Sequence, residues 1–322
     1  MIDLIIVNYN STEFLHDCLA SIKCSCDGLI PNVYVFDNGS KEPVEYINRT
    51  YPDVHVVPSK ENIGYSRAIN KVSSKTFSKY VVLLNPDTIV ISDRFFESIA
   101  EFMDGNPDVG ILGTRVTDPD GRIQGSARSF PKVNSFLFGR RSLLTRIFPN
   151  SRLACANILT QRTTKELPLD VDWVSGACMV IRREALNQIG LLDERFFLYW
   201  EDVDLCQRMW GREWRVTYWP GVKIMHHVGG SSESKVLRSV FEFHKSAMLY
   251  FNKHIHRYRF FLLPPIYGAI SLRFIGILIL QTLRRTILKL RKKPHHEEAD
   301  EAAQAWLYRS CVEHLFTKDL AN

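Results

Sequence analysis

One stretch of the chain decides the fold: Tyr80-Val81-Val82-Leu83-Leu84-Asn85-Pro86-Asp87-Thr88. Its apolar run ends at a proline turn, a pattern typical of a strand buried on both faces of a sheet. Similar short apolar runs occur at residues 4–7, 33–36 and 54–57, and apolar residues recur at helical spacing after the first of them. Strands that alternate with helices predict an α/β protein with a mostly parallel sheet.

The same alternation continues along the chain. We expect helices at residues 63–72, 183–189 and 201–210, and strands at 171–181, 216–219 and 222–225. Gly190 follows the second of these helices and would cap its end. Residues 125–169 are rich in Ser, Arg and Phe and predict a long connection that holds Arg128, Arg140 and Arg141.

The composition excludes several classes of protein. Of 322 residues, 45% are hydrophobic and 24% are charged, so the chain can bury a sizeable core and disorder is not expected. The net charge of +6 suits anionic partners such as nucleotide phosphates or a lipid surface. The 7 cysteines show no repeated metal-type spacing, which favours reduced thiols in a cytosolic protein. No basic segment precedes an apolar one at the N-terminus, so no signal peptide is predicted.

The character of the chain changes after about residue 235, and we expect a catalytic domain of residues 1–255 followed by a basic, amphipathic helical region of residues 256–322. A helix is expected at 236–252, Pro264-Pro265 predicts a break, and residues 266–283 form a strongly apolar segment with Arg273 at its middle. A charge there disfavours a spanning helix. Two interpretations remain. The segment is an amphipathic helix on an anionic membrane surface, or it packs on the rest of the chain or on a second subunit.

Polar residues follow the predicted strands directly, at Asn8, Asp37 and Asp87. In a parallel sheet, ligands bind beyond the carboxyl ends of the strands. The Asp37 carboxylate can accept hydrogen bonds from a pyrimidine N–H or a ribose hydroxyl, although Asp-Asn-Gly-Ser is also good turn chemistry. The Asp87 carboxylate suits a hard divalent cation such as Mg²⁺, although a turn or helix-capping aspartate would give the same pattern.

Two further groups of residues have the chemistry of a reactive site. Glu201-Asp202 follow an aromatic run, and apolar walls raise the pKa of a carboxyl group and make it a better base. The same acids could instead complement a helix N-terminus, as Asp193 and Asp204 are expected to do. His226-His227 follow a predicted strand and precede a glycine-rich turn, so a neutral imidazole there can complete a metal site or serve the fold alone.

Taken in order, these motifs resemble glycosyltransferase family 2, and within it the bacterial rhamnosyltransferase-like group. The resemblance spans roughly residues 1–255. It rests on Ile6-Val7-Asn8-Tyr9-Asn10, Val35-Phe36-Asp37-Asn38-Gly39-Ser40, Asn62-Ile63-Gly64-Tyr65-Ser66-Arg67-Ala68-Ile69-Asn70, Leu83-Leu84-Asn85-Pro86-Asp87-Thr88, Val174-Ser175-Gly176-Ala177, Phe197-Leu198-Tyr199-Trp200-Glu201-Asp202-Val203-Asp204-Leu205-Cys206-Gln207-Arg208 and His226-His227-Val228-Gly229-Gly230-Ser231.

The resemblance implies a GT-A fold, which is one Rossmann-like domain, and a nucleotide-sugar donor site. The donor-binding residues that it implies are Asn8, Asn10, Asp37, Asn62, Gly64, Arg67, Asn85 and Asp87. Asp87 would be the surviving carboxylate of the family's Asp-x-Asp motif, because Asn85 replaces the first acid. Asp87 and His226 would hold a divalent metal, Mg²⁺ or Mn²⁺, with one anionic ligand fewer than usual.

The resemblance also implies an inverting transfer, in which Asp202 is the catalytic base and Glu201 orients the acceptor. Trp173, Ser175, Gly176 and Trp200 would line the sugar and acceptor pocket. The expected donor is dTDP-L-rhamnose, and the expected acceptor is a glycan or lipid-linked saccharide of cell-surface polysaccharide, such as O-antigen or cell wall. The enzyme would then be cytoplasmic and peripheral on the inner face of the cell membrane.

Other functions remain open alongside this one. The donor could be a UDP-hexose or UDP-galactofuranose, or the chain could be a non-catalytic protein that binds nucleotide sugars or glycans on the same fold. The C-terminal helices could join two copies in a homo-oligomer. A nucleic-acid binder is disfavoured, because the basic residues cluster beside an apolar helix without an array of aromatic side chains for stacking on bases.

Overall fold

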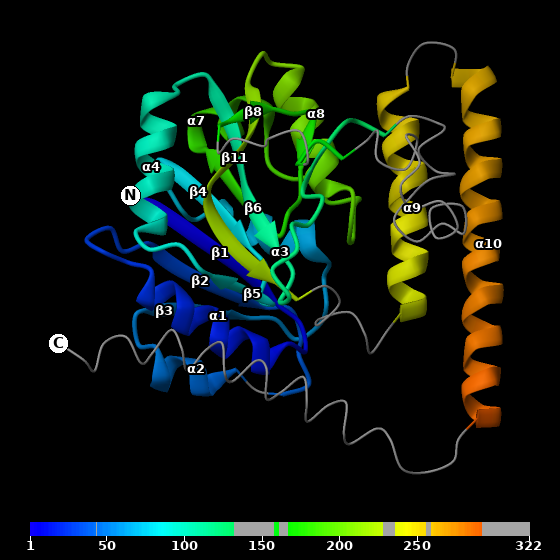
Figure 1. Ribbon diagram of the computed structural model, residues 1–322, viewed down its shortest axis with the longest axis horizontal. Helices are drawn as coiled ribbons and strands as arrows, with labels where there is room; N and C mark the ends of the chain where they lie inside the picture. Colours follow the sequence, from blue (N-terminus) through cyan, green and yellow to red (C-terminus); the bar gives the residue numbers. More distant parts are fainter. Residues whose placement is uncertain (43, 132–157, 161–166, 228–235, 256–258, 292–322) are drawn as a thin grey trace. The chain divides into compact units, whose positions relative to one another are not determined.

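The computed structural model describes residues 1–42, 44–131, 158–160, 167–227, 236–255 and 259–291 (Figure 1). A nine-stranded sheet has the order β3-β2-β1-β4-β10-β6-β11-β5, with β8 paired to β11, and a second sheet pairs β7 with β9. The strands are β1 (Ile2–Asn8), β2 (Asn32–Asp37), β3 (Val54–Pro58), β4 (Tyr80–Leu84), β5 (Thr88–Val90), β6 (Val109–Thr117), β7 (Ala127–Arg128), β8 (Leu169–Asp170), β9 (Trp173–Val174), β10 (Cys178–Arg182) and β11 (Arg215–His226). The described helices are α1 (Thr12–Cys24), α2 (Glu45–Thr50), α3 (Tyr65–Ser73), α4 (Phe95–Gly105), α7 (Arg183–Ile189), α8 (Glu201–Trp210), α9 (Val236–His254) and α10 (Arg259–Arg291).

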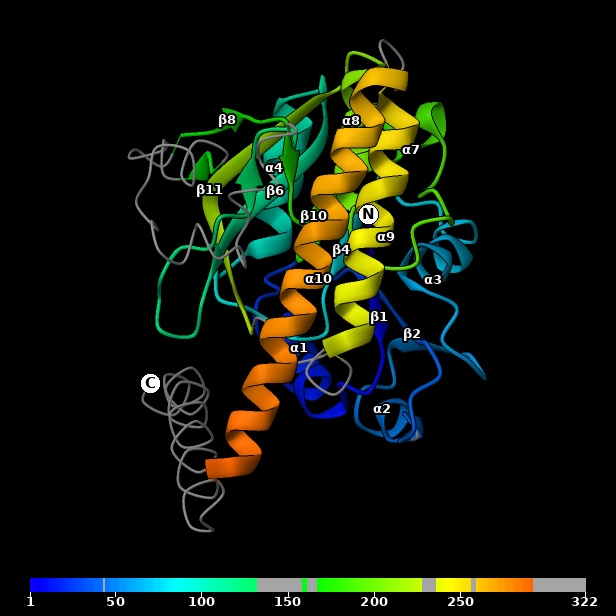
Figure 2. The ribbon, with the colours of Figure 1, turned by 90° about the vertical axis from the view of Figure 1, so that its right-hand side faces the viewer.

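The sheet is mostly parallel, as predicted. β1 runs parallel to β2 and β4, β2 to β3, and β6 to β11. β10 runs antiparallel to both β4 and β6, and β5 and β8 run antiparallel to β11. Figure 2 shows β10 between β6 and β4, in the middle of the sheet.

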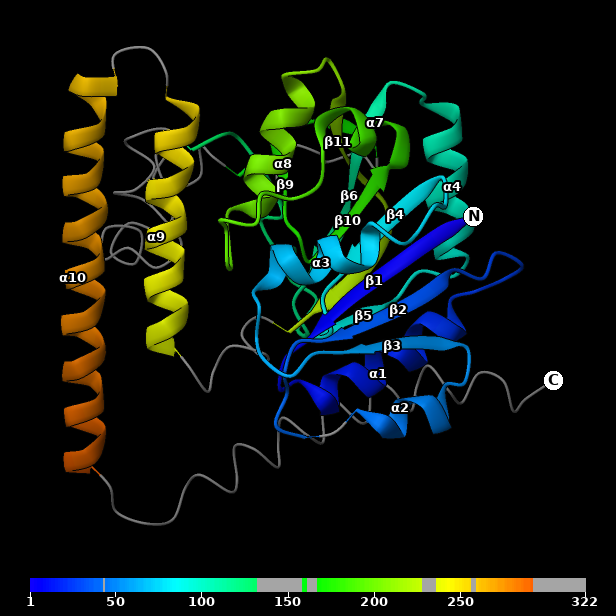
Figure 3. The same ribbon diagram turned by 180° about the vertical axis from the view of Figure 1, so that it is seen from behind.

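Alternating side chains of the strands fill two separate cores. Along β1, Leu4 and Ile6 belong to one core, and Ile5 and Val7 belong to the other, because successive side chains of a strand point to opposite faces. The first core includes buried residues of α1 and α4, and the second includes those of α3, α7 and α8. Figure 3 shows the face covered by α3 and α8. A strand covered on both faces must be apolar at every position, which is why the uniform runs identified β1 and β4.

Most of the elements expected from the sequence are confirmed, and two expectations are wrong. The segment at residues 216–225 is one strand, β11, whose register shifts between Trp219 and Lys223, where two strands were expected. Pro264-Pro265 do not break the helix, since α10 runs through both. They lie near its N-terminal end, where the flanking Phe260 and Phe261 are exposed and water can replace the hydrogen bonds that proline cannot make. Arg140 and Arg141 lie outside the described residues.

The helices that follow β11 pack on helix α8. A third apolar cluster joins Phe196, Trp200 and Val203 to residues of α9 and to Ile266 and Ile270 of α10. By its contacts the chain divides into Met1–Phe274 and Ile275–Asn322, and the expected boundary after residue 255 stays a prediction. By length and composition alone, Phe260–Ile279 could cross a membrane, and 11% of its most apolar window is buried.

Candidate functional site

The strand directions bring the polar ends of six strands to one edge of the sheet. β1, β2, β4 and β11 end there, and β5 and β10 begin there because they run the other way. The registers pair Asn8 with Asp37, Leu84 with Cys178, and Thr88 with His226. Residues that lie far apart in the sequence therefore meet at the edge where α/β sheets bind their ligands.

Asp37 is held at this edge by a small hydrogen-bonded group. Asn8 Nδ2 donates to Asp37 Oδ1 (3.0 Å), and Ser40 Oγ donates to the same oxygen (2.5 Å). Ser40 Oγ in turn accepts from the backbone N–H of Asn10 (2.9 Å). Asn8 is fully buried and Asp37 is 6% exposed. The carboxylate is thus fixed in one orientation, which suits recognition of a ligand by hydrogen bonds.

The turn before α3 explains why glycine stands at position 64. Asn62 Oδ1 accepts the Gly64 N–H (3.0 Å), and Gly64 has φ of 90°, a conformation that favours glycine. A Cβ added there would lie 2.8 Å from Phe197 Cδ2. The Tyr65 N–H then donates to Phe197 O (2.7 Å), so the start of α3 is attached to the segment that leads into α8. Arg67 instead forms a surface ion pair with Glu194 (3.3 Å).

Glu201 and Asp202 open helix α8 directly after two residues in the left-handed conformation, Tyr199 (φ 67°) and Trp200 (φ 72°). Asp202 Oδ2 accepts the Gly176 N–H (3.1 Å), and Oδ1 accepts the N–H of the next residue, Val203 (2.8 Å). Burial raises the pKa of Asp202, and the two backbone N–H groups only partly oppose this shift.

The two neighbouring acids differ in their surroundings. Glu201 is 8% exposed, whereas Asp202 is partly exposed. Burial raises the pKa of Glu201 well above its ordinary value, and the charge of Asp202 raises it further. The Glu201 Oε2 atom is buried and has no hydrogen-bond partner among the described residues. Burial and the charge of Asp202 therefore favour the protonated form of Glu201, and Asp202 is the more accessible acceptor for a proton.

Asp87, His226 and Asn85 form a second polar group at the same edge. His226 Nε2 lies 3.3 Å from Asp87 Oδ1 and 3.4 Å from Asn85 Nδ2. The His227 N–H donates to Asp87 O (2.9 Å), which joins the end of β11 to the start of β5. Across the described part of the chain, no three His, Cys, Asp or Glu side chains gather closely enough to hold a metal by themselves. Asp87 and His226 thus bring one carboxylate oxygen and one imidazole nitrogen within 3.3 Å of each other at this edge.

The four residues expected to line the sugar and acceptor pocket lie on two segments of the fold. Trp173 donates its indole N–H to Ser129 O (3.0 Å), and the Ser175 N–H donates to Ser126 O (2.8 Å), so both lie on the strand pair β7 and β9 or just beyond it. Gly176 contacts Asp202 directly. Trp200 is 8% exposed, with its ring 5.2 Å from that of Tyr250, and Trp173 packs against the same apolar cluster.

Two residues at this edge were missed by the sequence analysis, Tyr65 and Gln124. The Tyr65 hydroxyl is buried and has no partner among the described residues. Burial raises its pKa, and the charges of Glu201 and Asp202 raise it further. Tyr65 stands in the quoted Asn-Ile-Gly-Tyr motif, but the motif alone could not show that its side chain faces the two acids. Gln124 contacts His226 from a turn that carries no recognisable signal.

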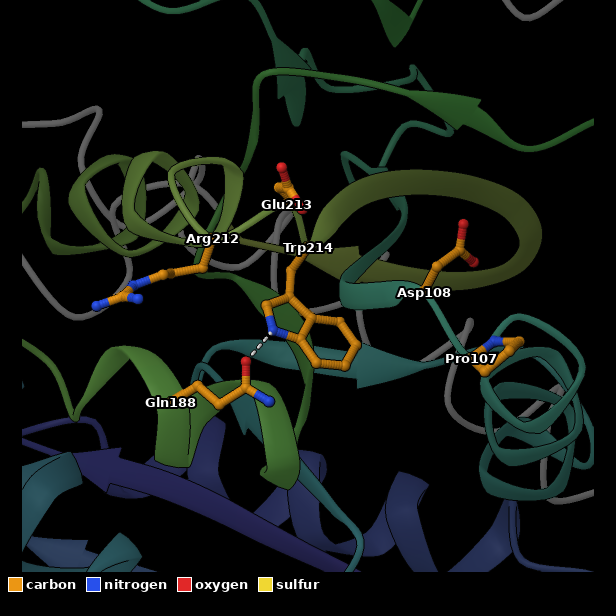
Figure 4. Close-up of a pocket in the computed structure, with 6 residues that line it drawn as sticks. All are labelled: Pro107, Asp108, Gln188, Arg212, Glu213 and Trp214. Carbon is orange, nitrogen blue, oxygen red and sulfur yellow. Dashed lines mark hydrogen bonds between the residues drawn. The ribbon is translucent and has the colours of Figure 1, made fainter.

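A separate pocket of about 440 Å³ lies at the opposite edge of the sheet (Figure 4). Its lining residues are Pro107, Asp108, Gln188, Arg212, Glu213 and Trp214. Asp108 and Trp214 directly precede β6 and β11, so they mark the ends of these strands that lie away from His226. Trp214 donates its indole N–H to Gln188 Oε1 (2.9 Å). None of the expected site residues lines this pocket.

Residues 3–190 match the family model described as "Glycosyl transferase family 2". The chain is 28% identical over 300 residues to the N-acetylglucosaminyl-diphospho-decaprenol L-rhamnosyltransferase of Mycobacterium tuberculosis (strain H37Rv), which covers 89% of this chain and 95% of that protein. It is 22% identical over 247 residues to the rhamnosyltransferase WbbL of Escherichia coli (strain K12), which covers 74% of this chain and 89% of that one.

Two solved structures share the fold. A structure of GalNAc-T7 with UDP, GalNAc and Mn²⁺ superposes with a TM-score of 0.59 at 16% identity, and the match covers 78% of this chain but only 47% of that one. The mannosyltransferase PcManGT of Pyrobaculum calidifontis, in complex with GDP-Man and Mn²⁺, gives a TM-score of 0.55 at 16% identity and covers 98% of this chain and 87% of that one. The expected GT-A fold is confirmed by these neighbours.

Proposed function

The chain belongs to glycosyl transferase family 2, and from this premise we propose that it transfers L-rhamnose from dTDP-L-rhamnose, with inversion, to a hydroxyl of a lipid-linked saccharide. The transfer of a glycosyl group follows from the family. One observation carries the proposed chemistry: Asp202, a carboxylate of raised pKa, is aimed by the Gly176 N–H at the sheet edge that also holds Asp37, Asp87 and His226.

The nucleotide half of the donor would bind at the carboxyl ends of β1 and β2. Asp37 is fixed by Asn8 and Ser40, so its orientation is set before a ligand arrives. A fixed carboxylate can accept the N3–H of a pyrimidine base, a contact that a freely rotating side chain would make at a higher cost in entropy. Asn10 and Asn62 lie in the adjoining turns and would line the same pocket.

Asp87 and His226 would hold a divalent cation, Mg²⁺ or Mn²⁺. Ligands at ~2.1 Å on adjacent corners of an octahedron stand ~3 Å apart, which fits the 3.3 Å between Asp87 Oδ1 and His226 Nε2. Two protein ligands leave room for phosphate oxygens to complete the coordination. When bound, the cation would neutralise the charge that develops on the departing diphosphate. Both solved neighbours are complexes that contain Mn²⁺, which supports the proposal.

The protein's own acids would carry out the proton transfer. Asp202 takes the proton of the acceptor hydroxyl as the acceptor oxygen bonds to the anomeric carbon and the bond from that carbon to the diphosphate oxygen breaks. Glu201, whose protonated form is favoured by burial, would donate a hydrogen bond to the acceptor. A single displacement from the face opposite the leaving group inverts the anomeric configuration.

The rhamnosyl donor and the lipid-linked acceptor rest on the relatives. The mycobacterial relative is named as an L-rhamnosyltransferase acting on a decaprenol-linked sugar, and the match covers 95% of its length. An acceptor of this kind lies in a membrane, which agrees with the exposed apolar side chains of α10 and the basic residues near its end. We place the enzyme on the cytoplasmic face of the cell membrane as a peripheral protein.

A panel of donors tests the proposal. Purified protein is incubated with Mn²⁺ and either dTDP-L-rhamnose, a UDP-hexose or UDP-galactofuranose, and its thermal midpoint is measured. A ligand that binds the native state stabilises it by about 2.7 kcal/mol at a hundredfold excess over its Kd. We expect the midpoint to rise with dTDP-L-rhamnose and to stay unchanged with the UDP sugars. The opposite pattern would identify a UDP sugar as the donor and leave the proposed glycosyl transfer unchanged.

A second measurement separates an enzyme from a binding protein. Release of dTDP is followed after a lipid-linked saccharide is added together with the donor. We expect release that depends on both the acceptor and the metal. Binding of the donor without release, with every acceptor supplied, would favour a protein that only binds nucleotide sugars.

A further inference from the structure

Gln124 contacts His226 from a turn that no motif marks. It follows the turn after β6, where its backbone N–H donates to Val116 O (2.8 Å) and brings the chain back alongside the strand. Its side chain is 8% exposed and reaches the end of β11, 102 residues further along the sequence. The two residues meet only because the fold places the turn after β6 beside the end of β11.

The orientation of the Gln124 amide is fixed by two acceptors. Its Nε2 lies 2.6 Å from Asp118 Oδ1 and 2.9 Å from the backbone O of His226. A carboxylate oxygen and a carbonyl oxygen can only accept hydrogen bonds, so the NH₂ group must face them. The reversed amide would place three acceptors against one another. Gln124 Oε1 must therefore face His226 Nδ1, which lies 3.3 Å away.

The amide in turn determines which nitrogen of His226 carries the hydrogen. A neutral imidazole has one N–H and one lone pair, and Oε1 can only accept, so the hydrogen is on Nδ1. The lone pair is then on Nε2, the atom that lies 3.3 Å from Asp87 Oδ1. In the neutral ring this lone pair can accept a hydrogen bond from Asn85 Nδ2, 3.4 Å away, or bind a divalent cation held beside Asp87.

We propose that Gln124 is a positioning residue that fixes His226 in the Nδ1–H form and so presents the Nε2 lone pair, beside Asp87, to a divalent cation. The inference rests on the metal site proposed above. A residue of this kind selects the tautomer and holds the ring of a metal-binding histidine, and its loss typically lowers metal affinity 10–100-fold. Asp118 holds the Gln124 amide in place and is part of the same chain of contacts.

The wild-type protein gives the first test and needs neither metal nor substrate. Long-range ¹⁵N–¹H NMR spectra distinguish a protonated ring nitrogen from one with a lone pair. We expect the hydrogen of the neutral His226 ring to be on Nδ1. A neutral ring with its hydrogen on Nε2 and its lone pair on Nδ1 would overturn the inference, and this result does not depend on whether any variant folds.

Mn²⁺ binding to variants gives the second test, measured by electron paramagnetic resonance with and without dTDP. Gln124→Leu keeps the approximate shape and removes the acceptor. We expect about 10–100-fold weaker Mn²⁺ binding and a mixture of His226 tautomers. The matched control is Gln188→Leu, because Gln188 also accepts an N–H, from Trp214, at the opposite edge of the sheet. The control should bind Mn²⁺ as the wild type does.

The outcomes distinguish the role of Gln124 from the existence of the metal site. Wild-type affinity in Gln124→Leu would overturn the role of Gln124 and leave the metal site standing. Wild-type affinity in His226→Ala, or no Mn²⁺ binding by the wild-type protein with dTDP present, would overturn the metal site itself and the inference with it. Asp118→Leu should weaken Mn²⁺ binding in the same direction as Gln124→Leu, because it removes one of the acceptors that orient the Gln124 amide.

Discussion

At the scale of single residues, two adjacent acids of α8 have been given different chemistry by their surroundings. Glu201 is buried and lacks a partner for one oxygen among the described residues, whereas Asp202 is partly exposed and accepts the Gly176 N–H. The raised pKa of Asp202 makes it a stronger base than an ordinary aspartate once it is ionised. This difference supports the proposed roles, in which Asp202 is the base and Glu201 orients the acceptor.

Asp202→Asn tests the role of the base. The amide keeps the shape and cannot take the proton, so we expect turnover to fall by about 10²–10⁴-fold. Affinity for dTDP should stay within a factor of a few, because the proposed nucleotide contacts lie at β1 and β2. Single-turnover rates and nucleotide titrations measure the two effects separately. Turnover close to that of the wild type would contradict the assignment.

Glu201→Gln tests the protonation state of the buried acid. The folded-state pKa of Glu201 lies above its ordinary value of 4.5, so the native state holds this proton more tightly than the unfolded chain. The free energy of unfolding then falls as pH rises from the ordinary value through the folded-state pKa. The variant does not lose stability in this way, because glutamine does not titrate. It should therefore be more stable than the wild type at pH 8 and equally stable below pH ~4.

Urea unfolding at the two pH values measures this difference. Glu184→Gln is the control, because Glu184 is an exposed acid in the first turn of α7. We expect its free energy of unfolding to follow the wild type at both pH values. A Glu201→Gln variant that is less stable than the wild type at pH 8 would mean that the acid is ionised and stabilised in the native state.

Tyr65→Phe tests whether the buried hydroxyl serves a ligand. Removing a hydroxyl that has no protein partner should leave the thermal midpoint unchanged or slightly raised. If the hydroxyl binds donor or acceptor, kcat/KM should fall roughly threefold to tenfold, the value of one hydrogen bond. A lowered midpoint with unchanged kcat/KM would indicate that the hydroxyl supports the fold instead.

The sequence located the site better than it described the contacts within it. Asn8, Asp37 and Asp87 were expected at strand ends, and the sheet does place them at one edge. Gln124 could not be found in this way. Its partner lies 102 residues away, and glutamine in a turn has no sequence signature. Long-range pairings depend on strand order, which local patterns do not encode.

At the scale of elements, α9 is attached to α8 by a buried cluster of charges around Asp204. This carboxylate is fully buried and accepts from His254 Nε2 (2.7 Å), Arg208 Nε (2.9 Å) and Lys253 Nζ (3.0 Å). Burial alone would raise the pKa of Asp204, but the hydrogen bonds from His254 and Lys253 outweigh it and lower the pKa. Asp204 also lies in the first turn of α8, where the sequence predicts that its charge complements the helix N-terminus.

Asp204→Asn should therefore destabilise the protein strongly. Removing one partner of a buried ionic cluster leaves the others uncompensated and costs about 3 kcal/mol or more. Asp108→Asn is the matched control, because the ion pair of Asp108 with Arg215 is 56% exposed on the acid side and is worth less than about 1 kcal/mol. Urea unfolding at neutral pH compares the two. Equal losses would contradict a special role for the buried cluster.

Element boundaries were predictable where local signals were complete. The expected helices at residues 183–189 and 201–210 agree with α7 and α8 at both ends, because an acidic first turn or a glycine cap marks them. The two errors have a common cause. Both elements continue through residues that disfavour them, because tertiary contacts outweigh the local preference. β11 is held by its pairing with β6, and α10 by the burial of Ile266 and Ile270.

At the scale of the whole molecule, α10 combines a packed face with an exposed one. Ile266 and Ile270 are fully buried, whereas Leu272, Ile275 and Ile279 are 73%, 50% and 54% exposed. Three exposed apolar side chains at intervals of three and four residues lie on one side of a helix. The interpretations left open by the sequence therefore apply to different faces of the same helix, and the exposed face is the one proposed for the membrane.

Replacing Leu272, Ile275 and Ile279 together by glutamate should release the protein from membranes. Burial of one such side chain is worth about 1.5–3 kcal/mol, so vesicle binding should weaken at least about tenfold. Sedimentation with vesicles of phosphatidylglycerol and phosphatidylcholine measures it, with phosphatidylcholine alone as the uncharged comparison. Wild-type protein that stays in the supernatant with both vesicles would contradict the proposed location.

The control for this experiment replaces three other exposed apolar residues by glutamate. Ile30, Phe77 and Leu167 are 76%, 86% and 62% exposed, and they belong to the catalytic part of the chain. The charge change is the same in both triple variants. Only a membrane contact made through α10 predicts that the first variant dissociates and the second stays bound.

The two left-handed residues before α8 have a consequence for how the sequence can vary. Tyr199 and Trp200 hold φ angles of 67° and 72°, which β-branched side chains tolerate poorly. Tolerance at both positions is therefore limited by backbone shape, independently of what either ring contacts. In a saturation mutagenesis screen, valine, isoleucine and threonine should be depleted there. Glycine and asparagine should be retained at these positions, although neither resembles an aromatic residue, because both adopt the left-handed conformation readily.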